Sequence, residues 1–242
     1  MKEIFLKTYD NIKIAANHFE NGSKNVLIIV HGWFMTKDSK PFFELSKILS
    51  KDIDVIAFDC RGHGRSEGKY SFSAQEEKDL LAVYDYAKAR YENIFLMGFS
   101  LGGALVLLHG AKYNNVSKII AISPPCSFEK IENKFWHPHA WIPTIRKCEL
   151  KTWFSVRANP FDLLFKRKPA PINEIESLKT PTLFVCGEKD PTVGMWHTKA
   201  LFEKASCEKR LEIFENGLHA EDLFLQDREK FVNLCREWIF GQ

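Results

Sequence analysis

The stretch Gly98-Phe99-Ser100-Leu101-Gly102-Gly103 decides how the rest of this chain is interpreted. The residues before it, 93–97 (Asn-Ile-Phe-Leu-Met), predict a short strand, and the Ala/Leu-rich residues 101–109 predict an apolar helix. Ser100 therefore lies on a strand-to-helix turn, where the central residue is strained and neighbouring Cβ atoms would clash. Glycines two residues to either side remove those atoms. The turn holds the Ser100 hydroxyl at the carboxyl edge of a sheet, beside the N–H groups of a helix start.

Residues 98–102 resemble the nucleophile elbow of the α/β-hydrolases, in which a Gly-x-Ser-x-Gly turn presents a reactive serine. The same pattern also occurs in glycine-rich turns that carry no chemistry. The interpretation therefore depends on whether the fold and the partner residues are found elsewhere in the chain.

Short apolar runs alternate with helical patterns along most of the chain, as in proteins built on a parallel sheet. An antiparallel hairpin is predicted first, and strands are predicted over residues 3–8, 12–19, 25–30, 54–58, 93–97, 117–123, 182–186 and 210–214. Helices are predicted from Ser39, from a capping box of Ser73 and Glu76 to about Arg90, and over residues 101–109, 196–205 and 227–240. Eight mostly parallel strands with helices between them form an α/β architecture, and the resemblance implies the α/β-hydrolase fold.

The alternation stops over residues 126–175, which hold five of the ten prolines and three of the six tryptophans. A segment of about 50 residues is too short for a second globular core. We therefore predict a core domain of residues 1–125 and 176–242 with a lid insertion of short helices at 126–175. The lid carries nine basic and five acidic residues, whereas the rest of the chain has 25 basic and 26 acidic ones.

Composition argues against several other classes of protein. The formal charge of +3 is too small to indicate nucleic-acid binding. No apolar run approaches the roughly 18 to 20 residues needed to cross a bilayer, and the N-terminus lacks the apolar region of a signal peptide. We expect a cytoplasmic protein with no stable membrane insertion. The cysteines show no metal-binding or redox spacing and are interpreted as reduced packing residues: Cys60, Cys126, Cys148, Cys186, Cys207 and Cys235.

A serine hydroxyl needs a base within hydrogen-bond reach and a carboxylate that orients the base. In α/β-hydrolases these residues follow the serine in the order acid, then histidine. Asp190 follows a late predicted strand, and His219 follows the last one by five residues. The resemblance thus implies a catalytic triad of Ser100 as nucleophile, His219 as general base and acid, and Asp190 as orienting carboxylate.

Other acidic residues compete with Asp190 for this role. Glu188, Glu221 and Asp222 lie in the same two loops, and Asp190-Pro191 is also a common way to begin a turn. The position of Asp190 before Pro191 favours it over its rivals.

The resemblance also implies an oxyanion hole made of two backbone N–H groups. One belongs to Leu101, and the other to Trp33 in His31-Gly32-Trp33, which is similar to the family's His-Gly-x loop. We interpret His31 as a structural histidine. The stretch 59–68 matches the family's Asp-x-Arg-Gly-His-Gly-x-Ser-x-Gly loop and is also interpreted as structural, so His63 is not assigned to catalysis.

Aromatic residues near the elbow and in the lid are candidates for the substrate cleft. They are Trp33, Phe34, Phe135, Trp136, Trp141 and Trp153. The alternative is that these rings only attach the lid to the core. The basic residues of the lid, Arg146, Lys147 and 166–168, are either solvated or attract an anionic substrate or interface.

We expect a serine carboxylic-ester hydrolase that acts through an acyl-enzyme on short-chain or aromatic, cinnamoyl-type esters. The branch it most resembles contains monoacylglycerol-lipase-like enzymes, serine-aminopeptidase-like hydrolases and cinnamoyl (feruloyl) esterases. A lipase or lysophospholipase, a thioesterase or an amidase of the same fold are alternatives, as is a non-catalytic binding protein. The partner is a small-molecule ester, no cofactor or metal is expected, and a homodimer is left open.

Overall fold

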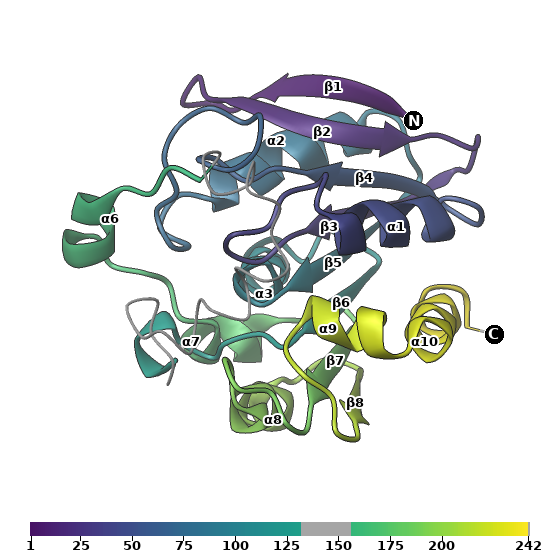
Figure 1. Ribbon diagram of the computed structural model, residues 1–242, viewed down its shortest axis with the longest axis vertical. Helices are drawn as coiled ribbons and strands as arrows, with labels where there is room; N and C mark the ends of the chain where they lie inside the picture. Colours follow the sequence, from purple (N-terminus) through teal and green to yellow (C-terminus); the bar gives the residue numbers. More distant parts are fainter. Residues whose placement is uncertain (132–155, 242) are drawn as a thin grey trace.

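A twisted central sheet with helices on both faces forms the body of the molecule (Figure 1). The computed structural model describes residues 1–131 and 156–241. The strands are β1 (Lys2–Lys7), β2 (Lys13–Phe19), β3 (Asn25–Val30), β4 (Asp54–Phe58), β5 (Asn93–Phe99), β6 (Lys118–Ile122), β7 (Thr182–Gly187) and β8 (Lys209–Phe214). The α-helices are α1 (Lys40–Leu49), α2 (Glu77–Lys88), α3 (Leu101–Tyr113), α6 (Pro160–Phe165), α7 (Pro171–Glu174), α8 (Met195–Lys204), α9 (Glu221–Gln226) and α10 (Arg228–Phe240). Short 3-10 turns are η1 (Phe128–Lys130) and η2 (Ile175–Ser177).

Within the described residues, eight strands form one sheet in the order β1-β2-β4-β3-β5-β6-β7-β8. β2 pairs antiparallel with β1 and with β4, and all other neighbours are parallel. The predicted α/β-hydrolase fold, with its mostly parallel sheet and N-terminal hairpin, is confirmed. All parallel strands end at the same edge of the sheet, so the loops that follow β3, β5, β6, β7 and β8 meet there.

The strand β3 shows why the sheet is buried on both faces. Val26, Ile28 and Val30 pack on one side with residues of α2, α3 and α8. Leu27 and Ile29 pack on the other side with residues of α1, α9 and α10. Because successive side chains of a strand point to opposite faces, an uninterrupted apolar run places a strand between two helical layers.

Two helical predictions need correction. The helix α2 begins at Glu77, and the predicted capping box is absent because neither Ser73 nor Glu76 caps the helix with its side chain. The Glu76 carboxylate instead accepts hydrogen bonds from the N–H and hydroxyl of Ser71, in a buried turn. The short helix α9 was not predicted, because its first residues, Glu221 and Asp222, are polar yet buried.

The described cysteines form no disulfide, and four of them, Cys60, Cys126, Cys186 and Cys235, are buried as predicted. Cys148 lies outside the described residues. Among the helices of residues 1–131 and 156–241, none has the length and apolar character that a membrane crossing requires.

The predicted lid begins and ends at neighbouring points of the structure. The N–H of Ile172 donates to the carbonyl of Cys126 at 3.1 Å. From there to η2 the chain packs against the core, since Ile175 is buried in the cluster formed by α2, α3 and α8. The division into a core domain and a lid stays a prediction, and these contacts agree with it.

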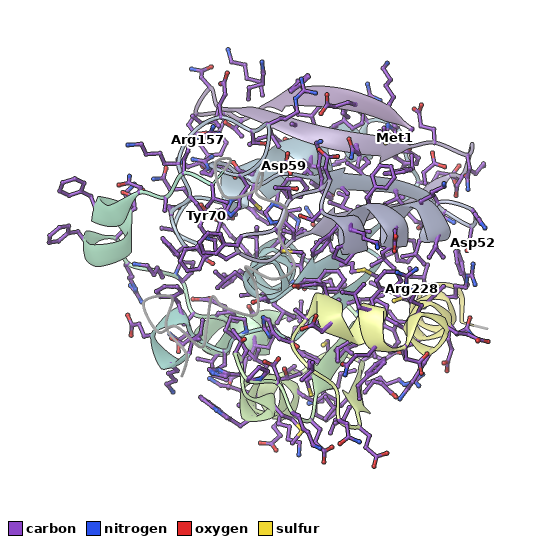
Figure 2. The ribbon with its side chains drawn as sticks, viewed as in Figure 1. Met1, Asp52, Asp59, Tyr70, Arg157 and Arg228 are labelled. Carbon is purple, nitrogen blue, oxygen red and sulfur yellow. The ribbon has the colours of Figure 1, made fainter. Side chains whose placement is uncertain are left out.

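A second attachment joins residues 157–159 to the loop after β4. The N–H of Arg157 donates to the carbonyl of Gly62 at 2.7 Å, the N–H of Tyr70 to Arg157 at 2.7 Å, and the N–H of Asn159 to Tyr70 at 2.8 Å. Tyr70 and Arg157 accordingly lie on the same side of the molecule (Figure 2). Three backbone hydrogen bonds thus fasten the second half of the predicted lid to the core.

Gly62 is required at this attachment. Its φ is +74°, and a Cβ atom there would lie 2.3 Å from both the Arg157 carbonyl oxygen and the Tyr70 nitrogen. We expect Gly62→Ala to lower the free energy of unfolding by about 3 kcal/mol, measured by urea denaturation. Gly22→Ala is the matched control, because Gly22 has a φ of +88° with nothing within 4 Å. It should cost only about 1 kcal/mol, and equal losses in both variants would contradict the steric argument.

Candidate active site

The turn between β5 and α3 holds Ser100 in the conformation that the sequence predicts. Its φ is +53° and its ψ is −119°, a strained combination for a residue with a side chain. A Cβ atom on Gly98 would lie 2.2 Å from the Gly102 carbonyl oxygen, and one on Gly102 would lie 2.4 Å from the Val30 carbonyl oxygen. Only glycine fits at either position, so these two residues allow the sharp turn.

His219 lies between Ser100 and Asp190 and is hydrogen-bonded to both. The His219 Nε2 atom is 2.9 Å from the Ser100 Oγ atom. The His219 Nδ1 atom is 2.7 Å from Asp190 Oδ2. The three predicted residues, which are up to 119 positions apart in sequence, therefore form one continuous hydrogen-bonded chain.

Asp190 is held as a buried acceptor. Its side chain has no exposed surface, and its Oδ1 atom accepts the N–H groups of Thr192 and Val193, each at 2.9 Å. Burial raises the pKa of this carboxyl, but the charge and hydrogen bond of His219 and the two N–H groups lower it more, so the net pKa is below its ordinary value. An ionised Asp190 accepts a hydrogen bond from the Nδ1–H group of His219, which leaves Nε2 as the acceptor for the Ser100 hydroxyl.

The loops that carry Asp190 and His219 are fastened to each other. The N–H of Lys189 donates to the carbonyl of Gly217 at 2.9 Å. Glu188, one of the rival carboxylates, accepts the N–H of Asn216 at 3.0 Å and so joins the same two loops. Its carboxylate has a structural partner, while that of Asp190 faces the histidine.

A sequence model described as the alpha/beta hydrolase family matches residues 27–234. The chain belongs to the alpha/beta hydrolase family. The AB hydrolase superfamily protein YisY of Bacillus subtilis is 25% identical, over 97% of this chain and 98% of that protein. Membership confirms the resemblance drawn from the elbow and the ordered partner residues.

Solved structures show the same fold. The esterase Pf2001 of Pyrococcus furiosus has a TM-score of 0.79 and 22% identity, covering 98% of this chain and 91% of that one. Est1E of Butyrivibrio proteoclasticus, solved with bound ferulic acid, has a TM-score of 0.74 and 20% identity, covering 99% of this chain and 98% of that one.

In this alpha/beta hydrolase, the loop after β3 runs directly beside the serine. A Cβ atom on Gly32 would lie 3.1 Å from the Ser100 Cβ atom, so the backbone of Gly32, the residue before Trp33, passes close to Ser100. Leu101 is the first residue of α3, where N–H groups have no partner within the helix. Both backbone segments named for the oxyanion hole are thus adjacent to the nucleophile.

His31 fixes the start of this loop. Its Nδ1–H donates to the Gly32 carbonyl at 2.6 Å, and its Nε2 accepts the N–H of Cys60 at 3.0 Å. Further along the loop, the N–H of Lys37 donates to Asp59 at 2.7 Å. Asp59 is fully buried, and burial raises the pKa of its carboxyl to about 6. The ends of β3 and β4 are therefore connected by buried hydrogen bonds, which agrees with the structural role assigned to His31.

His31 should make the stability depend on pH. Burial lowers the pKa of His31 from its ordinary 6.5 to about 4, although the bond to Gly32 opposes this. Because the unfolded chain binds the proton first, the free energy of unfolding falls as the pH drops from 6.5 toward 4. Between pH 7 and pH 5 we expect wild type to lose about 2 kcal/mol more than His31→Gln, measured by urea denaturation at both pH values. Equal losses would show that His31 does not contribute.

An aromatic cluster borders the loop. The Trp33 ring stacks on Phe34, with ring centres 4.7 Å apart, and meets the edge of Phe72 at 4.5 Å. Phe72 in turn contacts Tyr70 at 5.1 Å. Trp33 and Phe34 are both half-buried, and their place in a substrate cleft stays a prediction. The other predicted substrate-binding residues lie outside the described part of the chain: Phe135, Trp136, Trp141 and Trp153.

Sequence reasoning missed Ser123. This buried residue follows β6, and its hydroxyl accepts the N–H of Ala220, next to His219, at 3.2 Å. Ala220 itself has a φ of +50°. Ser123 thus holds the backbone beside the histidine in a strained conformation. Its position at the carboxyl end of a strand is the one signal that could have identified it.

We expect Ser123→Ala to reduce kcat for a soluble ester about ten- to a hundredfold, because His219 loses its backbone support. The buried N–H left behind should also cost about 1 to 3 kcal/mol of stability. Thr182→Val is the matched control, since it removes the buried hydroxyl bond to Thr180 at the far end of β7. Thr182→Val should lose stability while keeping its kcat. A Ser123→Ala enzyme with wild-type kcat would contradict the positioning role.

Proposed function

We propose that this protein is a serine carboxylic-ester hydrolase with Ser100, His219 and Asp190 as its catalytic triad. The observation that carries the proposal is the hydrogen-bonded chain from Ser100 Oγ through His219 to Asp190 Oδ2, with distances of 2.9 and 2.7 Å. It supplies the base and the orienting carboxylate that an unreactive hydroxyl requires.

The reaction proceeds through an acyl-enzyme. Ser100 Oγ attacks the ester carbonyl carbon while His219 Nε2 takes the hydroxyl proton. The bond to the alcohol oxygen then breaks, and His219 gives that oxygen the proton. Water attacks the acyl-enzyme in the second half, with His219 again as base, and the acid leaves as Ser100 recovers its proton. The negative charge of Asp190 stabilises the imidazolium that forms in each half.

The oxyanion hole consists of the backbone N–H groups of Trp33 and Leu101. Developing negative charge on the carbonyl oxygen is stabilised most by donors fixed before the reaction begins. The closeness of Gly32 to Ser100 and the buried hydrogen bonds of His31 support this assignment, because they hold the loop after β3 beside the nucleophile.

Short-chain and aromatic esters, including cinnamoyl-type esters, are the proposed substrate class. The half-buried rings of Trp33 and Phe34 beside the nucleophile support it, since flat aromatic surfaces favour flat or compact acyl groups. The ferulic acid bound to Est1E, a protein of the same fold, agrees with this choice. A panel that includes p-nitrophenyl acetate, methyl ferulate and monoacylglycerols tests it, because preference for monoacylglycerols would instead indicate a lipase.

A fluorophosphonate probe tests the proposed chemistry directly. Such a probe phosphonylates a serine only when a base activates it, so we expect modification of Ser100 with parallel loss of p-nitrophenyl acetate hydrolysis. Peptide mapping locates the label. The absence of labelling in folded protein would exclude an active serine hydrolase and favour a non-catalytic binding protein of this fold.

A further inference from the structure

The helix α6 stands at the margin of the molecule, apart from the other helices (Figure 1). It begins directly after the three backbone hydrogen bonds that fasten residues 157–159 to the loop after β4. The side chain of Asn159 caps it by accepting the N–H groups of Phe161 and Asp162. The helix is therefore short but firmly attached at its N-terminal end, on the side of the sheet where the strands end.

The described side chains of α6 differ in their surroundings. Asp162 is buried and accepts a hydrogen bond from the Gln75 side chain at 2.9 Å, which ties the helix to the residues before α2. Phe161 and Phe165 are 71% and 79% exposed, and their rings stack with centres 6.4 Å apart. Two aromatic rings at i and i+4 thus form a projecting apolar surface, although phenylalanine is normally buried.

Positive charge lies directly beside these rings. Lys166 and Arg167 are exposed, and Lys168 is half-buried with its amine bound to the carbonyls of Asp162 and Lys166. Lys166 pairs with the Asp162 carboxylate at 3.1 Å. Glu129 also interacts electrostatically with Lys168, so two acidic and three basic side chains leave a local charge of about +1 next to the apolar rings.

We propose that Phe161, Phe165 and the basic run Lys166–Lys168, here called the α6 surface, dock onto an anionic lipid surface. Exposed aromatic rings that enter the boundary between headgroups and acyl chains, with basic side chains beside them, form a peripheral membrane anchor. The basic residues add attraction to acidic headgroups, which a neutral apolar partner would not require. The Asp162 contact keeps the helix in place as the rings insert.

The docking goes beyond the proposed hydrolase function and does not depend on it. Lipid binding is measured without any ester, and a Ser100→Ala protein should bind vesicles as wild type does. Failure of docking and failure of catalysis are therefore separate results.

Co-sedimentation with vesicles tests the α6 surface. We expect the full chain to bind vesicles of phosphatidylcholine mixed with phosphatidylserine, and to bind pure phosphatidylcholine vesicles much more weakly. Phe161→Ser with Phe165→Ser should reduce the partition coefficient about tenfold or more. Lys166→Gln with Arg167→Gln should reduce it about fivefold or more, and the binding of wild type should weaken as salt is raised.

Two control variants match these changes. Tyr9→Ser removes a ring of similar exposure, 72%, from the turn between β1 and β2. Lys40→Gln with Lys47→Gln changes the net charge equally on α1, which lies in the layer on the other face of the sheet from α2 and α3. Both controls should bind as wild type does.

Four results would overturn the proposal. The first is a lack of vesicle binding by wild type, and the second is equal binding by the α6 variants and the controls. The third is a dimer of wild type that the phenylalanine variant loses, which would assign the surface to a second copy of the chain. The fourth is a KM for soluble esters raised more than about tenfold in the phenylalanine variant, which would assign the surface to substrate. Thermal denaturation of each variant verifies that the fold is retained.

Discussion

Replacing Ser100 with alanine is expected to lower kcat for p-nitrophenyl acetate by about a millionfold, because the attacking oxygen is lost. The residual rate would come from water attacking an ester held in the remaining site. Ser100 is half-buried, and its backbone is held by the bond from its N–H to Ile122 and by the close contacts of Gly98 and Gly102. The variant should therefore fold normally, as circular dichroism and thermal denaturation would show.

Ser50→Ala provides the matched control, since it removes an equivalent hydroxyl from the end of α1. Its kcat should stay within about twofold of wild type. The Ser100→Ala preparation should also fail to react with the fluorophosphonate probe. Retention of more than about one per cent of the wild-type kcat would rule out Ser100 as the nucleophile.

Asp190→Asn should lower kcat by about ten-thousandfold while leaving the fold intact. The asparagine oxygen can still accept the N–H groups of Thr192 and Val193, so the turn is preserved. Its amide nitrogen would then face His219 Nδ1 and donate to it, which places the imidazole proton on Nε2. In that tautomer the ring cannot accept the proton of Ser100. The measurement is kcat for a soluble ester, with the KM compared to show that binding is retained.

Glu188→Gln is the control for this loop. Glu188 is exposed, and its carboxylate meets only the N–H of Asn216 among the bonds described for it. The glutamine oxygen can accept that N–H equally, so kcat should change by no more than about twofold. Comparable losses in Asp190→Asn and Glu188→Gln would contradict the choice of Asp190 as the orienting carboxylate.

The sequence was sufficient for the fold because the strongest signals are local. The run over residues 26–30 is apolar without interruption, which is typical of a strand between two helical layers, and the structure places it there. The two glycines around Ser100 likewise require a sharp turn whatever else the chain does. The capping-box prediction was wrong because the Glu76 carboxylate had two possible partners. It accepts hydrogen bonds from the buried Ser71 turn and does not cap the start of α2.

The triad residues could be predicted from their order along the chain, but the contacts that hold them in position could not. Ser100, Asp190 and His219 each follow a strand, so a parallel sheet brings them to one edge. The bond from Ala220 to Ser123 joins residues 97 positions apart and has no sequence motif. The contact of the Trp33 ring with Phe72 also joins residues that are distant in sequence, since it depends on how two loops pack. Such contacts are visible only in three dimensions.

The bond between Cys126 and Ile172 has a consequence for engineering. Because the chain leaves the core and returns to it at atoms 3.1 Å apart, the intervening stretch can be exchanged as a cassette. A graft from a relative would need to match these two adjacent ends and the backbone bonds that residues 157–159 make with Gly62 and Tyr70. Each strand, with the loops bearing Ser100, Asp190 and His219, would keep its sequence. Exchanging this one segment could thus change the substrate range while the triad residues stay the same.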